Sequence, residues 1–438
     1  MHRGLRPAAT TDRDCSLNVA SEAIPPAVST DERPGPDPYD HHRPLDQWDP
    51  AATHAQLRSS CPVAHTPAHD GYWVVTSHDL VRRCGRDPEA FSSEHDLDGT
   101  RLGKEFGGIA IPPQGHYRSI PSEIDGAAFH QYRRLLLPWF TPAATAPWLP
   151  VIRAMVAEQL DRHLESGSID LVLDLANPVP AMVTMVLVGL DAHQWENFAE
   201  PLHSLVAAPP HSPTWLAALE GIGHLRATLL DLVIARRRSP THDVASVVVA
   251  AEIDGEPVSD ADAVNVLFTV VAGGVDTTTA LIANSLFWLS EHPDVRRQLI
   301  DEPNLRPSAR EEFLRVFSPA PATARTATRA VRIGGQDLGR GERLLLSWTA
   351  ANRDPAVFDE PDRVEVTRDA GPHVAFGFGP HRCIGAPLAR TTFDAVLDTV
   401  LDTIGDYVVD TAGAVRYPRV GAVNGWVSLP ARFSVPQR

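Results

Sequence analysis

The chain has 438 residues, 43% of them hydrophobic and 21% charged, and its formal net charge is -16 at pH 7. A chain of this length can bury a large core, which excludes a small scaffold held together by disulfides or metals. The acidic balance argues against nucleic acid or an anionic membrane as the main partner. The cysteines lie far apart without a C-x-x-C pair, so we expect no disulfide framework and no cysteine-rich zinc site; they are Cys15, Cys61, Cys84 and Cys383.

The first 45 residues are polar and rich in proline, with no sustained apolar period and no stretch that resembles a secretory signal. We expect residues 1–45 to be a disordered leader and residues 46–438 to form a single domain. The most apolar stretch, Val266 to Val275, falls well short of the ~18 residues that a spanning helix needs. The sequence therefore predicts a cytoplasmic protein without a membrane segment.

The first predicted elements are a short strand at 72–76 and a helix directly after it. Residues 92–124 are rich in glycine and proline, and a loop of this length inside a compact chain is usually either functional or disordered. Helical patterns dominate residues 127–300, with clear amphipathic stretches at 154–164 and 225–238.

A long helix is predicted to begin after Ser259, which has the side chain of an N-cap residue. It should run to about Ser290, because Pro293 disfavours helix at the residue before it. Strand-like pieces return at 331–333 and 344–347. Helical patterns thus dominate the middle of the chain, and the short strand-like pieces lie on either side of it.

The middle of this long helix contains the stretch A-G-G-V-D-T-T-T-A at 272–280, which violates helix propensity. Gly273 and Gly274 each cost about 1 kcal/mol relative to alanine. The Thr277 hydroxyl can bond back to the carbonyl of Gly273 and bend the helix. Such a local failure inside a strong element often marks a functional site. The alternative is a contact between two helices through the small glycines.

The most informative segment is F-G-F-G-P-H-R-C-I-G at 376–385, which matches F-G-x-G-x-H-x-C-x-G at every fixed position. Here the chain resembles the cytochrome P450 family of haem-thiolate monooxygenases, from about Leu45 to Phe433. The resemblance implies the cytochrome P450 fold, which is mainly α with small β-sheets, and haem b as cofactor. It makes Cys383 the axial iron ligand, with Phe376 and Gly377 beside the cofactor. The alternative for an isolated cysteine is a buried structural thiol.

Haem carries two propionates, which need charge-assisted donors when they are partly buried. The resemblance assigns this role to His381 and Arg325. A third anchor normally comes from a helix with His and, four residues later, Arg. Alignment with the family places that Arg on Arg133 and leaves Phe129 at the histidine position. His130 has the same spacing to Arg134, so Arg133 is the first choice and His130 a substitute.

Glu312 and Arg315 fit the pattern E-x-x-R, 71 residues before Cys383, where the family has it. By itself an i,i+3 pair of this kind is common on helices. Arg363 resembles the third member of the buried Glu-Arg-Arg cluster of the family. We expect this cluster to be structural and to hold the loop that presents Cys383.

In the long helix, the resemblance makes Asp276 the acid and Thr277 the alcohol of an oxygen-activating motif. It implies O₂-dependent oxidation, such as hydroxylation, of a small organic substrate. Electrons would come from NAD(P)H through a separate ferredoxin and ferredoxin reductase, because only about 55 residues follow Cys383. The alternatives are a haem-thiolate peroxygenase, isomerase or dehydratase, or a non-catalytic haem sensor.

We expect an apolar pocket. Its walls are predicted from the 92–124 loop, residues 207–218, Ala320 to Ala324, and Trp426 to Ser428.

Overall fold

The structure is a computed structural model that describes residues 39–96, 106–113 and 117–435. Residues 1–38 of the expected leader lie outside the described residues. The last seven residues of that leader are described, and they pack on the body of the protein. Tyr39 is buried, and its carbonyl accepts a hydrogen bond from the Thr66 hydroxyl at 2.7 Å. The Leu45 amide donates to the carbonyl of Pro418 at 2.8 Å.

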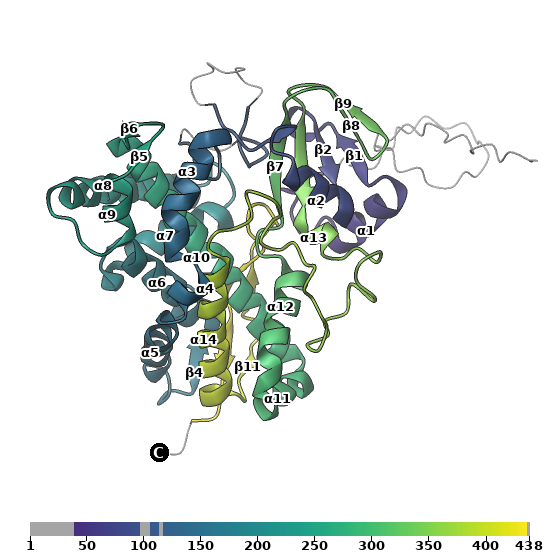
Figure 1. The fold of residues 1–438 in the computed structure, drawn as a ribbon. Coiled ribbons are helices and arrows are strands. Elements are labelled where there is room, and N and C mark those ends of the chain that lie inside the picture. The colour runs from purple at the N-terminus through teal and green to yellow at the C-terminus, as the bar shows by residue number, and fades with distance from the viewer. Residues whose placement is uncertain (1–38, 97–105, 114–116, 436–438) are drawn as a thin grey trace, which may run out of the picture.

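Helices form most of the described chain (Figure 1). They are α1 (Pro50–Ser60), α2 (His78–Arg86), α3 (Gly126–Leu136), α4 (Pro142–Thr145), α5 (Trp148–Asp161), α6 (Pro178–Val188), α7 (Glu196–Ala207), α8 (Pro213–Arg238), α9 (Val244–Val249), α10 (Asp260–Glu291), α11 (Pro293–Asp301), α12 (Arg306–Phe317), α13 (Trp348–Ala351) and α14 (Ala386–Ile404). A single π-helical turn, η4 (Leu171–Ala176), precedes α6.

The strands are short. They are β1 (Val63–Thr66), β2 (Tyr72–Val75), β3 (Phe91–Ser92), β4 (Ser168–Asp170), β5 (Glu252–Ile253), β6 (Glu256–Pro257), β7 (Ala322–Ala327), β8 (Val331–Ile333), β9 (Gln336–Leu338), β10 (Arg343–Ser347), β11 (Val408–Val409), β12 (Val415–Arg416), β13 (Trp426–Ser428) and β14 (Pro430–Arg432). The largest sheet has the order β1-β2-β10-β7-β3, and β10 runs parallel to β2, with Leu345 opposite Val74. The fold is therefore mainly α with small β-sheets.

Helix α10 passes through the middle of the helical part and packs against α6, α8, α14 and α12 (Figure 1). It can do so because apolar residues occur on most of its circumference, and seventeen of its residues are buried. The sheet that contains β1, β2, β7 and β10 lies to one side, beside α1 and α2 (Figure 1). The cavity described below lies where α10 meets β7 and the segment that precedes α14.

The boundaries of α10 follow from local chemistry. The Ser259 hydroxyl accepts a hydrogen bond from the amide of Asp262 at 3.0 Å and caps the helix, as the sequence predicts. The helix ends at Glu291, and Pro293 opens α11. The predicted strands at 72–76, 331–333 and 344–347 correspond to β2, β8 and β10.

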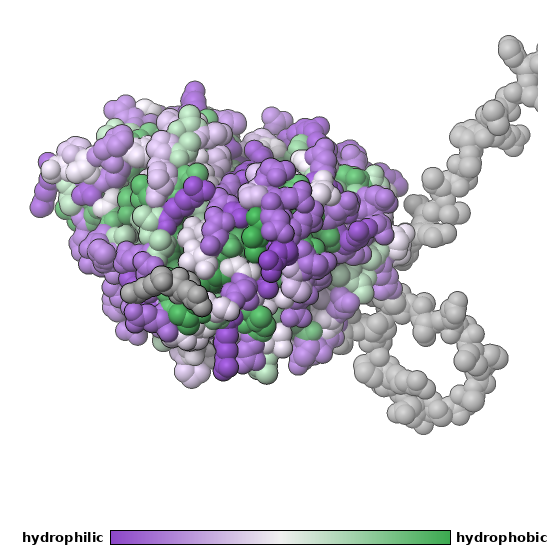
Figure 2. Space-filling view, turned by 90° about the horizontal axis from the view of Figure 1, so that it is seen from below, coloured by the Kyte–Doolittle hydropathy of each residue, from purple (hydrophilic) through white to green (hydrophobic). Residues whose placement is uncertain are grey.

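Two helical stretches are long and apolar enough to cross a membrane by length and composition, Leu171–Val188 and Asp260–Glu291. Both are mostly buried inside the fold, as core helices are. Figure 2 shows one outer face on which hydrophilic residues predominate and hydrophobic ones appear in small patches. The apolar character of the two stretches is thus used for packing within the protein.

Candidate active site

A cavity of about 490 Å³ lies between α10 and the loop before α14, with further walls from α3, α6 and β7. Most of the surface that lines it is apolar. It brings together sequence-predicted residues from four regions of the chain that are far apart: Arg133, Gly273, Thr277, Arg325, Phe376, Gly377, His381 and Cys383. The remaining predicted residues, His130, Asp276, Glu312, Arg315 and Arg363, are not among those that line it.

The loop that carries Cys383 is closed by backbone contacts. The Cys383 amide donates to the carbonyl of Phe376 at 2.8 Å. Gly377 and Gly379 both have positive φ, at 72° and 82°. A side chain at Gly379 would place its Cβ 1.9 Å from the carbonyl oxygen of Gly85 in α2, so only glycine allows the loop to approach that helix.

Cys383 has a free thiol, and the accessible surface of this thiol faces the cavity. It lies deep in the protein, so burial raises the pKa of this thiol. The amides of Gly385 and Ala386 and the guanidinium groups of Arg133 and Arg382 oppose that rise. Two backbone amides and two nearby positive charges thus favour the thiolate, the form in which a cysteine binds a metal ion.

Arg325, on β7, carries a buried guanidinium group. Its guanidinium donates to the carbonyl of Ala324 at 2.6 Å and to the Thr323 hydroxyl at 3.3 Å. Among the described residues no carboxylate lies within ion-pair distance of it. Burial lowers the pKa of Arg325 to about 10, and the carboxylate of Asp125 partly offsets this. A buried guanidinium in this state can be stabilised by an anion bound in the cavity.

His381 is oriented by a residue that the sequence analysis did not assign. Its Nε2 donates to Oδ1 of Asp125 at 2.8 Å. The other carboxylate oxygen of Asp125 accepts from the Ser93 amide at 3.0 Å and from the Ser92 hydroxyl at 2.5 Å. Asp125 immediately precedes α3, and its partner His381 is 256 positions away in the sequence. Because Nε2 is engaged, Nδ1 is the nitrogen left for another contact.

The choice between the two predicted third anchors is decided by the direction of their side chains. Arg133 lines the cavity and donates to the carbonyl of Arg382 at 2.8 Å. His130 and Arg134 are exposed on the other side of α3 and do not line the cavity. Arg133 therefore stays the proposed third anchor, and His130 lies outside the cavity lining. Phe129 takes the inward position and packs on the His381 ring, with 4.1 Å between ring centroids.

On α10, the two consecutive glycines have different roles. A Cβ on Gly273 would meet no atom within 4 Å, because this residue opens onto the cavity. A Cβ on Gly274 would lie 2.5 Å from the Thr184 hydroxyl oxygen, so this glycine lets α6 approach α10 closely. Gly273 therefore fits the functional interpretation alone, whereas Gly274 lines the cavity and also fits the helix-contact interpretation.

The Thr277 hydroxyl donates to the carbonyl of Gly273 at 2.9 Å, the i−4 bond that the sequence predicts. Thr277 lines the cavity. Asp276, one residue earlier, is buried and points toward α7, where its Oδ1 lies 3.4 Å from Nδ1 of His203. The two residues of the motif therefore have different surroundings.

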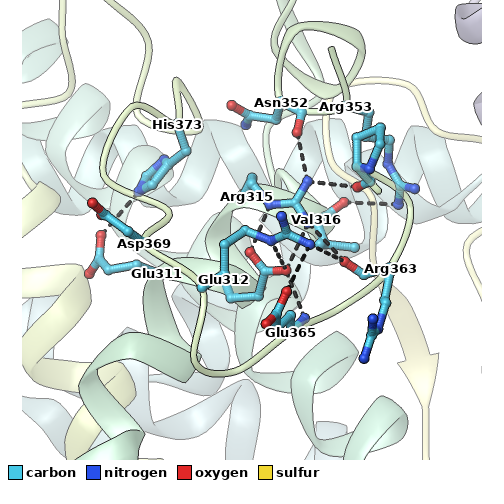
Figure 3. Close-up of polar contacts among 12 residues, drawn as sticks. Glu311, Glu312, Arg315, Val316, Asn352, Arg353, Arg363, Glu365, Asp369 and His373 are labelled. Atoms are coloured by element: carbon cyan, nitrogen blue, oxygen red, sulfur yellow. Dashed lines mark hydrogen bonds and ion pairs between the residues drawn. The ribbon is translucent and has the colours of Figure 1, made fainter. Parts of the chain in front are cut away.

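Figure 3 shows the cluster of polar contacts around Glu312. Glu312 and Arg315 are fully buried, and Nε of Arg315 lies 2.7 Å from Oε2 of Glu312. Arg315 also donates to the carbonyl of Asn352, whose side-chain oxygen accepts from the Val374 amide just before the cysteine loop. The cluster is thus connected by hydrogen bonds to the segment that leads into the loop.

The third cation of this cluster is Arg368, which corrects the assignment of Arg363. Nε of Arg368 lies 3.1 Å from Oε1 of Glu312, and its side chain is 11% exposed. The Arg363 side chain is 64% exposed, pairs with Glu360 and points away from the buried pair (Figure 3). Only the backbone carbonyl of Arg363 takes part, as an acceptor from Arg315. The sequence did not reveal this, since both arginines lie in the same irregular segment.

The predicted pocket walls are present in part. The glycine- and proline-rich loop contributes Ile109, Ser119, Pro121 and Ser122, and the region of Ala320 to Ala324 contributes Ala320 and Thr323. Residues 207–218 and Trp426 to Ser428 do not line the cavity. The Trp426 indole instead donates to Asn284 at 3.0 Å and packs on Phe287. Part of the loop, residues 97–105 and 114–116, lies outside the described residues.

The cavity fits a haem. Its lining includes one thiol, the open space at Gly273, and the basic side chains of Arg325, Arg133 and His381. Within the described ranges, no group of three or more His, Cys, Asp or Glu is arranged to hold a metal ion. A macrocycle supplies its own nitrogen ligands and needs only the thiolate from the protein. The buried, unpaired guanidinium of Arg325 matches a propionate in charge.

Comparisons with known proteins agree with this geometry. A family model described as cytochrome P450 matches residues 227–306 and 307–403. Cytochrome P450 130 of Mycobacterium tuberculosis is 34% identical over 344 residues, covering 76% of this chain and 83% of that protein. Linalool 8-monooxygenase of Pseudomonas putida is 31% identical over 369 residues, covering 82% and 89%.

Solved structures are similar along most of the chain. A mutant of P450 EryK in complex with erythromycin B has a TM-score of 0.78 and 29% identity, covering 89% of this chain and 97% of that one. CYP109E1 from Bacillus megaterium in complex with testosterone has a TM-score of 0.78 and 26% identity, covering 89% and 99%. The fold expected from the resemblance is thus confirmed.

Proposed function

Because the chain belongs to the cytochrome P450 family and is a haem-iron monooxygenase by class, we propose that it hydroxylates or otherwise oxidises a small organic molecule. The electrons come from NAD(P)H through separate redox partners. The observation that carries this proposal is that the Cys383 thiol and the Thr277 hydroxyl line the same apolar cavity. That arrangement suits a cofactor held from one side and dioxygen bound on the other.

Cys383 is proposed as the iron ligand of a haem b. When bound, the haem supplies the dioxygen activation that no side chain here can perform. The protein stabilises the thiolate form of Cys383 with the amides of Gly385 and Ala386, which face the sulfur. The close contact of Gly379 with Gly85 keeps the loop rigid, so the thiolate points into the cavity.

Arg325, Arg133 and His381 are proposed to bind the propionates. Arg325 and Arg133 each provide a planar fork of donors that fits a carboxylate. His381 donates from Nε2 to Asp125, so the neutral ring presents Nδ1 as an acceptor, and a hydrogen bond to a propionate would require the imidazolium form, in which Nδ1 also donates. Two guanidinium groups and one imidazole among the lining residues would orient a flat ligand with its acidic side toward them.

Thr277 is proposed to donate a hydrogen bond at the dioxygen site, and Asp276 to help deliver protons there. The Thr277 hydroxyl has a single proton and uses it toward Gly273 in the resting geometry. Rotation of the hydroxyl about the Cβ–Oγ bond would redirect this proton into the cavity. The open groove at Gly273 leaves room for dioxygen and for water beside it.

A ferredoxin is the proposed electron donor, and arginines near the ligand loop support this. Arg382 is exposed next to Cys383. Arg82 and Arg86 lie over the Phe378 ring, at 4.3 Å and 5.2 Å from its centroid. A basic patch of this kind attracts an acidic partner even when the net charge of the protein is negative.

Substrate binding can be tested first, by the spin-state change that a ligand causes in the haem spectrum. The panel should include linalool, testosterone and erythromycin B, because these compounds are named with the similar proteins described above. It should also include fatty acids, aromatic acids and other terpenes. Any compound that binds provides the substrate for the test of mechanism.

That test compares wild type with Thr277→Ala and Thr277→Ser, as product formed per NAD(P)H consumed. Thr277→Ala should still consume NAD(P)H and O₂ but release hydrogen peroxide, while Thr277→Ser should restore much of the coupling. Tight coupling in Thr277→Ala, in the presence of a substrate without hydroxyl groups, would refute the role of Thr277. Product formation without NAD(P)H and redox partners would instead indicate a peroxygenase, isomerase or dehydratase.

A further inference from the structure

Asp276 and Thr277 are neighbours in α10 but face different parts of the protein. Successive residues of an α-helix are rotated by about 100°. Thr277 lines the cavity, whereas the Asp276 side chain is only 6% exposed and lies outside the cavity wall. Whatever orients the Asp276 carboxylate must therefore lie on the elements that pack behind it.

Two side chains occupy that space. Nδ1 of His203 lies 3.4 Å from Oδ1 of Asp276 and 2.8 Å from the hydroxyl oxygen of Tyr417. The imidazole of His203 also packs edge-on against the Tyr417 ring, with 5.4 Å between centroids. His203 belongs to α7 and Tyr417 to the segment after β12, so three distant parts of the chain meet at this point.

The hydrogen bonding of this group is incomplete. Within the described residues, neither Oδ1 of Asp276 nor Nε2 of His203 has a hydrogen-bond partner. A buried carboxylate oxygen without a donor is costly. A proton on Nδ1 of His203 would be shared between Oδ1 of Asp276 and the Tyr417 hydroxyl oxygen, which then accepts, and would give the carboxylate a donor. No other basic side chain of the described chain lies within ion-pair distance of that carboxylate.

We propose that His203, held in place by Tyr417, is the positioning residue for Asp276 and makes the orientation of this acid depend on the seating of α7. The inference rests on the proposed role of Asp276 in proton delivery. It adds the group that orients the acid, and the helix that carries this group.

The packing of α7 explains why its position would matter. Val206 and Ala207, at the end of the helix, pack with Tyr417 and with Ala280 of α10 in one apolar cluster. The helix rests on α8, where Gly221 leaves room for Pro201. A displacement of α7 would therefore move His203 away from Asp276 and leave the carboxylate without its donor.

The experiment compares His203→Gln, Tyr417→Phe, Asp276→Asn and the double variant His203→Gln/Asp276→Asn with wild-type holoenzyme. His224→Gln, an exposed histidine on α8, is the matched control. The first readout needs no turnover: hydrogen exchange of the α7 backbone, residues 196–207. The second is product formation under conditions in which Asp276→Asn is slowed.

We expect faster exchange in α7 for both His203→Gln and Asp276→Asn, since each removes one side of the same contact. Turnover of His203→Gln should fall about ten-fold, a typical loss for a group that orients another. The double variant should be no slower than Asp276→Asn alone, because residues that act as a unit are not additive. Tyr417→Phe, which keeps the ring and loses only the hydroxyl, should show a smaller effect in the same direction.

Wild-type turnover in His203→Gln, with Asp276→Asn slowed, would overturn the positioning role and leave the proposed function intact. Faster α7 exchange in His203→Gln alone, without a change in turnover, would show a packing role only and would also overturn it. Wild-type turnover in Asp276→Asn would refute the acid itself, and with it the role of His203. The three results are distinguishable within one set of variants.

Discussion

The guanidinium of Arg368 lies 3.1 Å from the carboxylate of Glu312 and completes the buried ionic cluster around it. Glu312 accepts from Arg315, Arg368 and the Glu365 amide. Burial opposes ionisation of Glu312, but these donors outweigh it and hold the pKa of the carboxyl below its usual value. Arg363, five residues earlier, contributes only its carbonyl.

Replacing Arg368 should therefore be far more harmful than replacing Arg363. Arg368→Ala leaves part of a buried carboxylate unpaired, which costs about 3–5 kcal/mol. Arg363→Ala removes an exposed side chain, and its free energy of unfolding should change by less than about 0.5 kcal/mol. For both variants, denaturant unfolding measures the change in the free energy of unfolding, and the haem-to-protein ratio measures the retention of haem. Equal effects of the two substitutions would contradict the assignment of Arg368, rather than Arg363, as the third cation of the cluster.

Arg325→Gln should release haem faster while leaving thiolate ligation intact in the protein that retains haem. A hydrogen bond to a charged group contributes about 1.5–3 kcal/mol, which corresponds to a roughly 10- to 100-fold change in affinity. The loss of Arg325 removes the cation with the most buried guanidinium of the site. Transfer of haem to an apoprotein acceptor gives the rate. Unchanged transfer in Arg325→Gln and in His381→Ala would contradict the propionate assignment.

Arg133 and Arg134 form a matched pair for the third anchor. They are adjacent on α3, but only Arg133 lines the cavity. Arg133→Ala should speed haem loss, whereas Arg134→Ala and His130→Gln should behave as wild type. The same transfer assay distinguishes them. If His130→Gln lost haem and Arg133→Ala did not, the helix would have to be rotated relative to the geometry found here.

Cys383→Ser should abolish the red-shifted Soret band of the reduced, CO-bound protein that indicates thiolate ligation. Cys84 is the control, since it is a free thiol buried in the core against β7 and β10 rather than in the cavity. Cys84→Ala should retain the band. A wild-type haemoprotein with the CO spectrum of histidine ligation would rule out Cys383 as the ligand.

Glu311 should make the protein sensitive to acid. Burial opposes its ionisation, but hydrogen bonds from Arg390 and His373 outweigh this and hold the pKa of its carboxyl well below the usual value. A carboxyl with a lowered folded-state pKa adds stability that is complete above its unfolded pKa, about 4.3, and is lost as pH falls toward the folded pKa.

The free energy of unfolding of wild type should therefore exceed that of Glu311→Gln by a constant amount from about pH 7 to pH 5. The difference should shrink below about pH 4. Urea unfolding across this range measures it. Glu302→Gln, at an exposed site, should show no such dependence. A constant difference down to pH 2 would mean that the Glu311 interactions do not depend on its charge.

The sequence by itself determined the features that depend on short spacings. The cysteine segment at 376–385 identified the family, and the N-cap at Ser259 with Pro293 fixed the ends of α10. The bond from Thr277 to Gly273 follows from the i−4 geometry of a helix. In each case both partners lie within a few residues of each other, so local covalent geometry decides the contact.

Only the tertiary structure decided which side chains from distant segments meet. Asp125 and His381 are 256 positions apart, and Tyr417 and His203 are 214 apart. Arg368, and not the predicted Arg363, pairs with Glu312. The sequence did not predict this because an irregular segment has no fixed period that shows which side chain points inward. The orientation of α3 likewise places Arg133, and not Arg134, in the lining of the cavity. Such contacts depend on how elements pack in three dimensions, which the spacing of residues along the chain does not record.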